Sequence, residues 1–438
     1  MRNSKQIRRH LTISAARKCL PAQRMLNKLR PMRSLVFAVV LLLVLFATPR
    51  LHAADVEWEP EANMDHQLFP SLLISTASVR PVDSDDYEGE EKDASLLGDR
   101  FGLVGIEIHS PAANTKVKVT LKGNDLMNES VWEGELPDAD EDYFIAPKVN
   151  YKFDHLRKMT QQVPLSVDFA VEIDGEPAGD KVDTLQIRSL NDCPFGVSND
   201  EETINDENFI AGAASLGWMF AAYVNENHPM LDKILKEALD TKIVNAFLHY
   251  QGDDEASVLQ QVFAVWTALQ KRGIQYSSTT TTPGGSEVVY SQYIRFVDQS
   301  ITNSQANCAD GSVMFASVLR KLSIKPFLVT IPGHMYIGFY TKPDKSAFVG
   351  LETTIIGVPK ASDEPKQGEP GSLTALREKL PDSVKQTKAW GSFARAIQIA
   401  SEDLAKNAEK FDKGDPGYQK IDLDEARQEG IMPIPAAQ

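Results

Sequence analysis

The sequence predicts an α+β protein, in which helices pack on an antiparallel sheet, preceded by a β-sandwich-like domain. Two observations lead to this fold class. Between residues 101 and 195 apolar residues alternate with polar ones, which is typical of half-buried strands. From about residue 205 the apolar residues recur at the three- and four-residue spacing of amphipathic helices, and short apolar runs follow these helices. We therefore expect a β-rich part followed by a part built of helices and a sheet.

The first 53 residues have the features of an export signal. A basic stretch reaches Arg33, the apolar run Leu35 to Ala47 follows, and "TPRLHAAD" supplies small residues for cleavage near Ala53 or Ala54. A membrane-spanning helix needs about 20 apolar residues, so the shorter run favours cleavage over permanent anchoring. An uncleaved anchor is the alternative. We expect an exported protein, periplasmic or extracellular, without stable membrane insertion once the signal is cleaved.

The charge balance argues against one class of partner. The chain has 46 Lys and Arg against 61 Asp and Glu, and residues 1–53 hold 11 of the basic residues and none of the acidic ones. Residues 54–438 therefore carry a formal net charge of −26. Phosphate binding requires a basic face, so nucleic acid is not an expected partner. Only Cys193 and Cys308 follow residue 53, too few for a disulfide framework, so stability must come from buried cores.

The N-terminal half is predicted to contain a linker and a β domain. Residues 54–100 are poorly periodic and end in "PVDSDDYEGEEKDAS", which predicts an irregular acidic linker region. In residues 101–195 the segments "LVGIEIHS", "KVKVTL" and "PLSVDFAVEIDGE" alternate as strands do, and Asp174-Gly175 predicts a hairpin turn into "DTLQIRSL". No cluster of catalytic residue types occurs there. Binding or spacing is its expected role, with an unknown partner.

The C-terminal half is predicted to hold the chemistry. The segment "LNDCPFGVSND" reads as an interdomain linker, and residues 205–400 form the expected second domain. Its segments "ENFIAGAASLGWMFAAYV", "HPMLDKILKEALDTKIVNAFLHY" and "DDEASVLQQVFAVWTALQKRG" have helical periodicity, the last with an aspartate as N-cap and Gly273 beyond its end. Residues 401–438 are predicted to be a helical and polar tail.

One stretch places chemically reactive residue types close to one another. In "NCADGSVMFASVLRKL" Cys308 stands at the start of a helix, with Asn307 or Asp310 available as a cap. Unpaired amide groups and the positive end of the helix dipole favour a thiolate there. The strands "PFLVTI" and "HMYIGFY" follow, the second headed by His334, and "AFVGLETT" carries Glu352. These segments can bring nucleophile, base and orienting carboxylate to one edge of a sheet.

Residues Tyr290 to Thr354 resemble the transglutaminase-like core of the papain-like fold. The resemblance rests on the cysteine that opens a helix, the helix-to-strand segment "SVLRKLSIKPFLV", the histidine strand "GHMYIGFY" and the acid in "LETT". It is closest to bacterial members with a "Q-x-I-R" segment upstream, here "SQYIRF". The family implies a thiolate at Cys308, a general base and acid at His334, and an orienting acid at Glu352. Most relatives use Asp as this acid and place an aromatic residue directly after the histidine.

Two questions about this site stay open in the sequence. Besides the backbone amide of Cys308, Gln292 is the candidate oxyanion donor and Tyr293 the second choice, although either side chain can simply pack under the sheet. A disulfide between Cys193 and Cys308 is the alternative to a free thiol, because exported cysteines usually oxidise, and it would abolish nucleophilicity.

The sequence therefore predicts an exported cysteine enzyme of transglutaminase-like type that attacks amide bonds in a protein or peptide substrate. Hydrolysis is favoured, because a secreted enzyme meets water at far higher concentration than any amine. A protein-crosslinking acyltransferase and a non-catalytic binding or scaffold protein that kept the fold are the alternatives. No metal or nucleotide cofactor is implied, because the other histidines do not have the spacing of a zinc site.

Overall fold

The structure is a computed structural model of the 438-residue chain. It describes residues 53, 56–78, 94–99, 102–198, 213–252, 254–278, 286, 288–357, 368–415 and 417–435. The predicted export signal, except for Ala53, lies outside the described residues, as does most of the acid-rich segment before residue 94. Among the described residues, no helix has both the length and the apolar character needed to cross a membrane.

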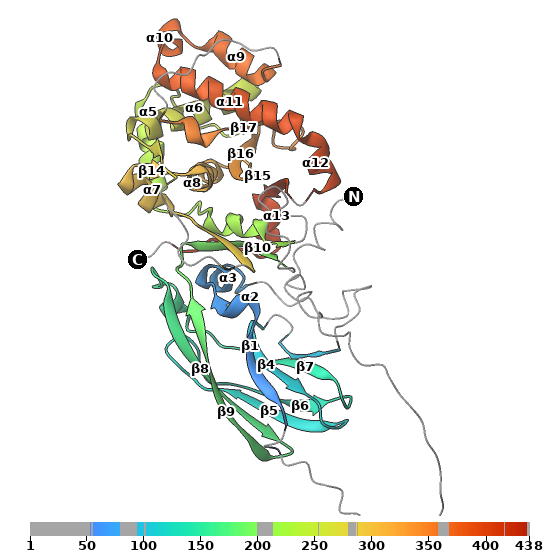
Figure 1. Ribbon diagram of the computed structural model, residues 1–438. Helices are drawn as coiled ribbons and strands as arrows, with labels where there is room; N and C mark the ends of the chain where they lie inside the picture. The colour runs from blue at the N-terminus through green and yellow to red at the C-terminus, as the bar shows by residue number, and fades with distance from the viewer. Residues whose placement is uncertain are drawn as a thin grey trace, which may run out of the picture.

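The α+β class is confirmed, and its two structural types occupy opposite ends of the molecule (Figure 1). Strands β1 to β9 form the β-rich end, and most helices gather around a second group of strands at the other end. Most buried apolar side chains of both ends belong to one continuous cluster, and a small second cluster lies in the helical end. The two ends therefore share a core.

Two sheets build the β-rich end, as the alternation of apolar residues predicted. The first has the strand order β1-β4-β7-β3, with β1 (Trp58–Ala62), β4 (Val104–His109), β7 (Asp142–Ala146) and β3 (Leu96–Gly98). The second has the order β2-β9-β8-β5-β6, with β2 (Gln67–Leu68), β9 (Glu176–Ile187), β8 (Val163–Ile173), β5 (Thr115–Leu121) and β6 (Ser130–Leu136). The hairpin between β8 and β9 turns at Asp174 and Gly175, which both have positive φ, as a type I′ turn requires.

The prediction of an irregular linker over residues 54–100 is wrong for its first half. Strand β1 pairs antiparallel with β4, and β2 pairs parallel with β9. The short helices α2 (Asn63–His66) and α3 (Pro70–Ser75) lie between the two ends of the molecule (Figure 1). This segment alternates poorly because side chains on both faces of β2 and most of α3 are buried, so there is no polar face to set a period.

The predicted interdomain linker around Cys193 is also wrong. Residues Asp192–Ser198 form β10, the central strand of a sheet with the order β11-β10-β13. Its neighbours are β11 (Ala213–Ser215) and β13 (Val289–Tyr293), and α3 packs against it. Cys193 is fully buried in this strand. The segment reads as a linker because it is short and contains a proline, whereas its partner β13 lies about a hundred residues away in sequence.

The helical predictions hold in part. Their outcome is clearest for α6, which begins after the N-cap Asp254 and ends before Gly273. The first segment predicted as a helix, "ENFIAGAASLGWMFAAYV", instead forms β11 and the 3-10 helix η4 (Gly217–Tyr223) in its described part, which begins at Ala213. Helix α5 ends ten residues earlier than expected, at Asp240. The helices of this end are α5 (Met230–Asp240), α6 (Glu255–Lys271), α7 (Val297–Asn303), α8 (Cys308–Lys321), α9 (Gly371–Lys379), α10 (Asp382–Lys385), α11 (Lys388–Lys406), α12 (Ala408–Lys413) and α13 (Leu423–Gln428).

A four-stranded antiparallel sheet forms the centre of the helical end. Its order is β17-β16-β15-β18, with β17 (Phe348–Leu351), β16 (His334–Tyr340), β15 (Pro326–Ile331) and β18 (Gln419–Asp422). The two faces of the sheet belong to different apolar clusters, one shared with α8 and one with the end of α11. Strand β18 comes from the region predicted as a helical and polar tail, so that prediction is wrong there. One short parallel pair also belongs to this end, β12 (Gln275–Tyr276) with β14 (Gln305–Ala306).

Candidate active site

Cys308 is the first residue of α8, and a reciprocal cap fixes that helix end. The Asn307 side chain accepts a hydrogen bond from the backbone N–H of Asp310 at 2.8 Å. The Asp310 carboxylate in turn accepts from the backbone N–H of Asn307 at 3.0 Å. This capping box orients the first turn and leaves the Cys308 thiol half-buried. Cys308 and Cys193 are both free, so the alternative of a disulfide between them is not realised.

His334 opens β16 directly after a tight turn from β15. Gly333 in this turn has a φ of +71°, and Ile331 pairs with His334 across it. The imidazole Nε2 lies 2.7 Å from Oε2 of Glu352. The thiol of Cys308 lies close enough to the same ring to be the main influence that raises its pKa.

Glu352 directly follows β17 and caps the 3-10 helix η5 (Thr353–Ile355). Its Oε1 accepts hydrogen bonds from the backbone N–H and the hydroxyl of Thr354, at 2.9 and 2.6 Å. Both carboxylate oxygens are therefore engaged, and the side chain is only 7% exposed. Gly311 of α8 permits this arrangement, because a Cβ there would stand 2.7 Å from the Thr353 hydroxyl.

Hydrogen bonding in this group favours the charged forms of both His334 and Glu352. The bonds with Cys308 and with Glu352 raise the pKa of His334 to about 10, against the opposing effect of burial. Burial acts to raise the pKa of Glu352, but the bonds from His334 and Thr354 outweigh it, so this pKa is lowered. A protonated imidazole between a thiol and a carboxylate is the charge state that stabilises a neighbouring thiolate.

The structure also shows a buried ion pair behind the cysteine to which the sequence analysis assigned no role. Arg295 ends the segment that resembles "Q-x-I-R", and its Nη1 donates to Oδ2 of Asp310 at 2.7 Å. The backbone N–H of Arg295 donates to the other oxygen, also at 2.7 Å. The only sequence signal was the arginine of that segment, because nothing local pairs it with an acid 15 residues later.

Tyr276 is a second neighbour that the sequence analysis missed. It lies in β12, beside the strand β14 that leads into Cys308, and its side chain is about half exposed. Burial and the proximity of Cys308 and Glu352 raise the pKa of its hydroxyl. Tyr276 therefore stands at the rim of the Cys308, His334 and Glu352 group. It escaped notice because it precedes a loop-like, threonine-rich segment.

The two candidate oxyanion donors lie on β13. Gln292 is half-buried and stands opposite Cys193 of β10. Tyr293 is half-buried and faces Arg295, Asp192 and Asp310. Their predicted part in oxyanion binding stays a prediction, whereas the structure brings Cys308 and Glu352 to the same ring of His334.

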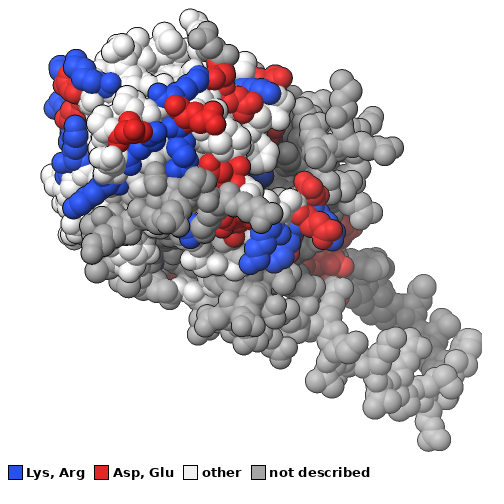
Figure 2. Space-filling view, turned by 90° about the horizontal axis from the view of Figure 1, so that it is seen from above, with Lys and Arg blue, Asp and Glu red and all other residues white. Residues whose placement is uncertain are grey.

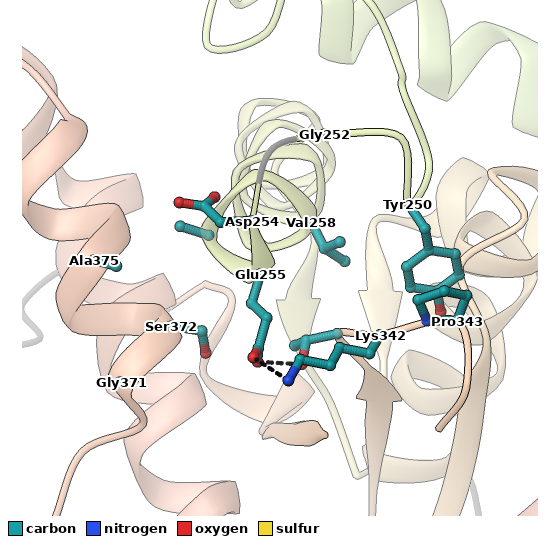
Figure 3. Close-up of a pocket in the computed structure, with 12 residues that line it drawn as sticks. Tyr250, Gly252, Asp254, Glu255, Val258, Lys342, Pro343, Gly371, Ser372 and Ala375 are labelled. Atoms are coloured by element: carbon teal, nitrogen blue, oxygen red, sulfur yellow. Dashed lines mark hydrogen bonds and ion pairs between the residues drawn. The ribbon is translucent and has the colours of Figure 1, made fainter. Parts of the chain in front are cut away.

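A separate cavity of about 470 Å³ opens at the far end of β16 (Figure 3). Glu255 points into it, accepts a hydrogen bond from the Thr341 hydroxyl at 2.6 Å and pairs with Lys342 at 3.2 Å. Thr341 follows β16, whereas His334 begins it, so roughly 20 Å of strand separates this cavity from the candidate site. The cavity lining does not include Cys308 or Glu352.

Charges of both signs are interspersed on the face formed by the last helices (Figure 2). Pairs such as Lys379 with Asp254 at 2.5 Å and Lys385 with Asp382 at 2.7 Å place opposite charges beside each other in this region. Neither sign forms a continuous field on the face shown.

Comparison with protein-family models, with curated proteins and with solved structures found no match to this chain.

Proposed function

We propose that this chain is a cysteine enzyme of transglutaminase-like type that attacks amide bonds in a protein or peptide, and that it favours hydrolysis. One observation carries the proposal. The imidazole of His334 lies 2.7 Å from the buried carboxylate of Glu352 and close enough to the thiol of Cys308 for that thiol to raise its pKa. A nucleophile, a base and an orienting group in hydrogen-bond reach of one another are the signature of nucleophilic catalysis.

The first half-reaction is acylation. The Cys308 sulfur attacks the amide carbonyl carbon, forming a C–S bond and a tetrahedral oxyanion. The C–N bond then breaks, and the imidazolium of His334 gives its proton to the leaving amine. The products are the free amine and a thioester on Cys308. Glu352 holds the ring in place throughout, since its other oxygen is fixed by Thr354.

The second half-reaction releases the acyl group. Neutral His334 takes a proton from water, the resulting hydroxide attacks the thioester carbonyl, and the C–S bond breaks to restore the thiolate and imidazolium pair. An amine in place of water would give a crosslinked product by the same steps. The partial exposure of the His334 side chain, 33%, supports water as the acceptor, because the site stands open to solvent.

The proposal includes a finer fold and a location. The helix that opens with Cys308, followed by the strands β15, β16 and β17, supports a papain-like and transglutaminase-like domain, and the two sheets of the β-rich end support a sandwich-like domain. Export to the periplasm or the extracellular space follows from the basic and apolar sequence of residues 1–53.

The test uses mass spectrometry of a peptide-amide substrate pool incubated with the purified protein, with and without an added primary amine. We expect cleaved acids in both samples, and no product from Cys308→Ala. Cys193→Ala is the matched control, because this other free cysteine is fully buried and is not one of the three residues that carry the proposed chemistry. Amine adducts in place of acids would favour the acyltransferase. No product in any sample, together with a slow, unactivated Cys308, would favour the non-catalytic alternative and overturn the proposal.

A further inference from the structure

A single buried carboxylate ties the first turn of α8 to a distant segment. Asp310 is fully buried and accepts from the backbone N–H of Arg295, from the Arg295 guanidinium and from the backbone N–H of Asn307, at 2.7, 2.7 and 3.0 Å. The Arg295 side chain is itself only 9% exposed. These bonds hold the residue before Cys308 to the segment that follows β13.

We infer that Arg295 is a positioning residue for Cys308, which acts through Asp310 and sets both the place and the charge state of the thiol. The inference rests on the proposed function, because it takes Cys308 as the nucleophile. Arg295 itself contacts Asp310 rather than the sulfur, so it is not assigned a catalytic step.

The positional part follows from the geometry of the helix start. In a capping box the N3 side chain fixes the backbone of the N-cap residue, and here the N3 residue is Asp310 and the N-cap is Asn307. Arg295 holds both oxygens of that N3 carboxylate, one through its backbone and one through its side chain. The orientation of the residue between them, Cys308, therefore depends on the pair.

The charge part follows from the position of Asp310 in the same helical turn as Cys308. The two residues stand two positions apart in α8, so their side chains point to different sides of the helix and interact through the electric field rather than by contact. An uncompensated carboxylate there opposes formation of a thiolate, and Arg295 neutralises it. At an effective dielectric constant of about 20, loss of that neutralisation shifts a neighbouring titration by on the order of one pH unit. Burial raises the pKa of Asp310, while bonds from Asn307 and Arg295 act to lower it.

Other ionisable groups face this region and are left unchanged by the test. His334 of β16, Glu352 before η5 and Tyr276 of β12 surround Cys308. Tyr293 of β13 faces Arg295 and Asp310. The Arg295 variants keep all these groups, so a difference between variants in the pH dependence of Cys308 labelling reports the change at Arg295.

Helix α8 supplies a matched control at its opposite end. Arg320 lies in the last turn, is 16% exposed, and pairs with Glu226 at 3.1 Å and Asp424 at 2.9 Å. Its loss removes a partly buried arginine and its ion pairs from the same helix. It leaves the first turn intact, so it reports the effect of destabilisation alone.

The experiment measures the rate of iodoacetamide labelling of Cys308 against pH, by peptide mass, in the full chain. We expect Arg295→Met to raise the pH midpoint of the labelling rate by on the order of one pH unit. Arg295→Lys should raise this midpoint less. Neither Asp310→Asn nor Arg320→Met should raise it. A structural role alone would move Arg295→Met and Asp310→Asn in the same direction.

Three results would overturn the inference: an unchanged midpoint in Arg295→Met, an equal upward shift in Arg320→Met, or an upward shift in Asp310→Asn. If Arg295→Met does not fold, Arg295→Lys and Asp310→Asn carry the same comparison. Failure of the proposed function is distinguishable, because labelling needs no amide substrate: the shift would remain while cleavage of the peptide pool is absent.

Discussion

At the scale of single residues, Cys308 and Glu352 favour the protonated form of His334, and His334 and Thr354 favour the ionised form of Glu352. The raised pKa of His334, about 10, means that its protonation is favoured more in the folded chain than in the unfolded one. The lowered pKa of Glu352 means that its ionised form is favoured more in the folded chain than in the unfolded one. Such shifts make the stability of the protein depend on pH.

The pair predicts a pH window for its own contribution to stability. The raised pKa of His334 gives stability that is complete below pH 6.5 and is lost as the pH rises to about 10. The lowered pKa of Glu352 gives stability that is complete above pH 4.5 and is lost as the pH falls. Glu352→Gln should therefore cost most between pH 4.5 and 6.5, about 1–3 kcal/mol after allowance for the solvent-exposed part of the ring. Urea unfolding of both proteins at pH 5.5 and 9.5 measures the difference.

Glu255→Gln is the control for this prediction, because Glu255 pairs with a lysine rather than a histidine. A cost of Glu352→Gln that is equal at the two pH values would show that the His334 pair is not charged as described.

The local sequence was sufficient to bring together the three proposed catalytic residues but not their supports. Cys308, His334 and Glu352 each stand at the start or end of an element that has strong periodicity, and their order along the chain suggested one site. Arg295 and Tyr276 reach the site only through tertiary packing. Helix α7 separates Arg295 from its partner Asp310 in the sequence. Tyr276 comes near Cys308 because β12 pairs with β14, the two-residue strand that leads into Cys308. Neither contact leaves a local pattern.

At the scale of elements, the sequence predicted the strands that are buried on one face only and the long helices. Strands β4, β5 and β8 alternate, and α6 and α8 have capped ends, so each carries its own signal. Strands β10 and β18 carry none. Strand β10 contains a proline and β18 has four residues, and each pairs with a strand about a hundred residues away in sequence, β13 or β15. Their existence depends on partners that local periodicity cannot indicate.

Strand β18 predicts that the C-terminal region is required for folding. A chain that stops after Asp415 loses β18 and α13 and leaves β15 as an exposed edge beside the candidate site. It also loses the fully buried Leu423 and the buried Ile431 and Ile434, which are worth about 1.5–3 kcal/mol each. We expect this protein to aggregate, as size-exclusion chromatography would show. A soluble monomer with the wild-type melting temperature would mean that β18 is dispensable.

At the scale of the whole molecule, the β-rich end and the helical end are joined by buried contacts as well as by the chain. Ser71 of α3 donates to the backbone carbonyl of Asp192 in β10 at 2.6 Å. Arg188, at the end of β9, donates to Asp192 at 3.2 Å and to Gln67 of β2 at 3.2 Å. Both side chains of this ion pair are 1% exposed. The junction therefore resembles a domain core more than a hinge.

The buried junction predicts that the two ends unfold in one transition. Arg188→Met leaves the Asp192 carboxylate buried without its cation, which typically costs about 3–5 kcal/mol. Because Asp192 lies in the central strand of the junction sheet, we expect this loss to destabilise both ends equally. Arg188→Met combined with Asp192→Asn should recover much of the stability, since it removes the unpaired charge.

Hydrogen exchange followed by mass spectrometry, with increasing urea, tests this coupling in peptides from each end. Strands β5 and β8 report the β-rich end, and helices α6 and α8 report the helical end. In Arg188→Met the midpoints of all four elements should fall together, because β10 pairs with β13 on one side while α3 packs against it from the β-rich end. If β5 and β8 open at lower urea while α6 and α8 keep the wild-type midpoint, the two ends are independent domains and the junction does not couple them.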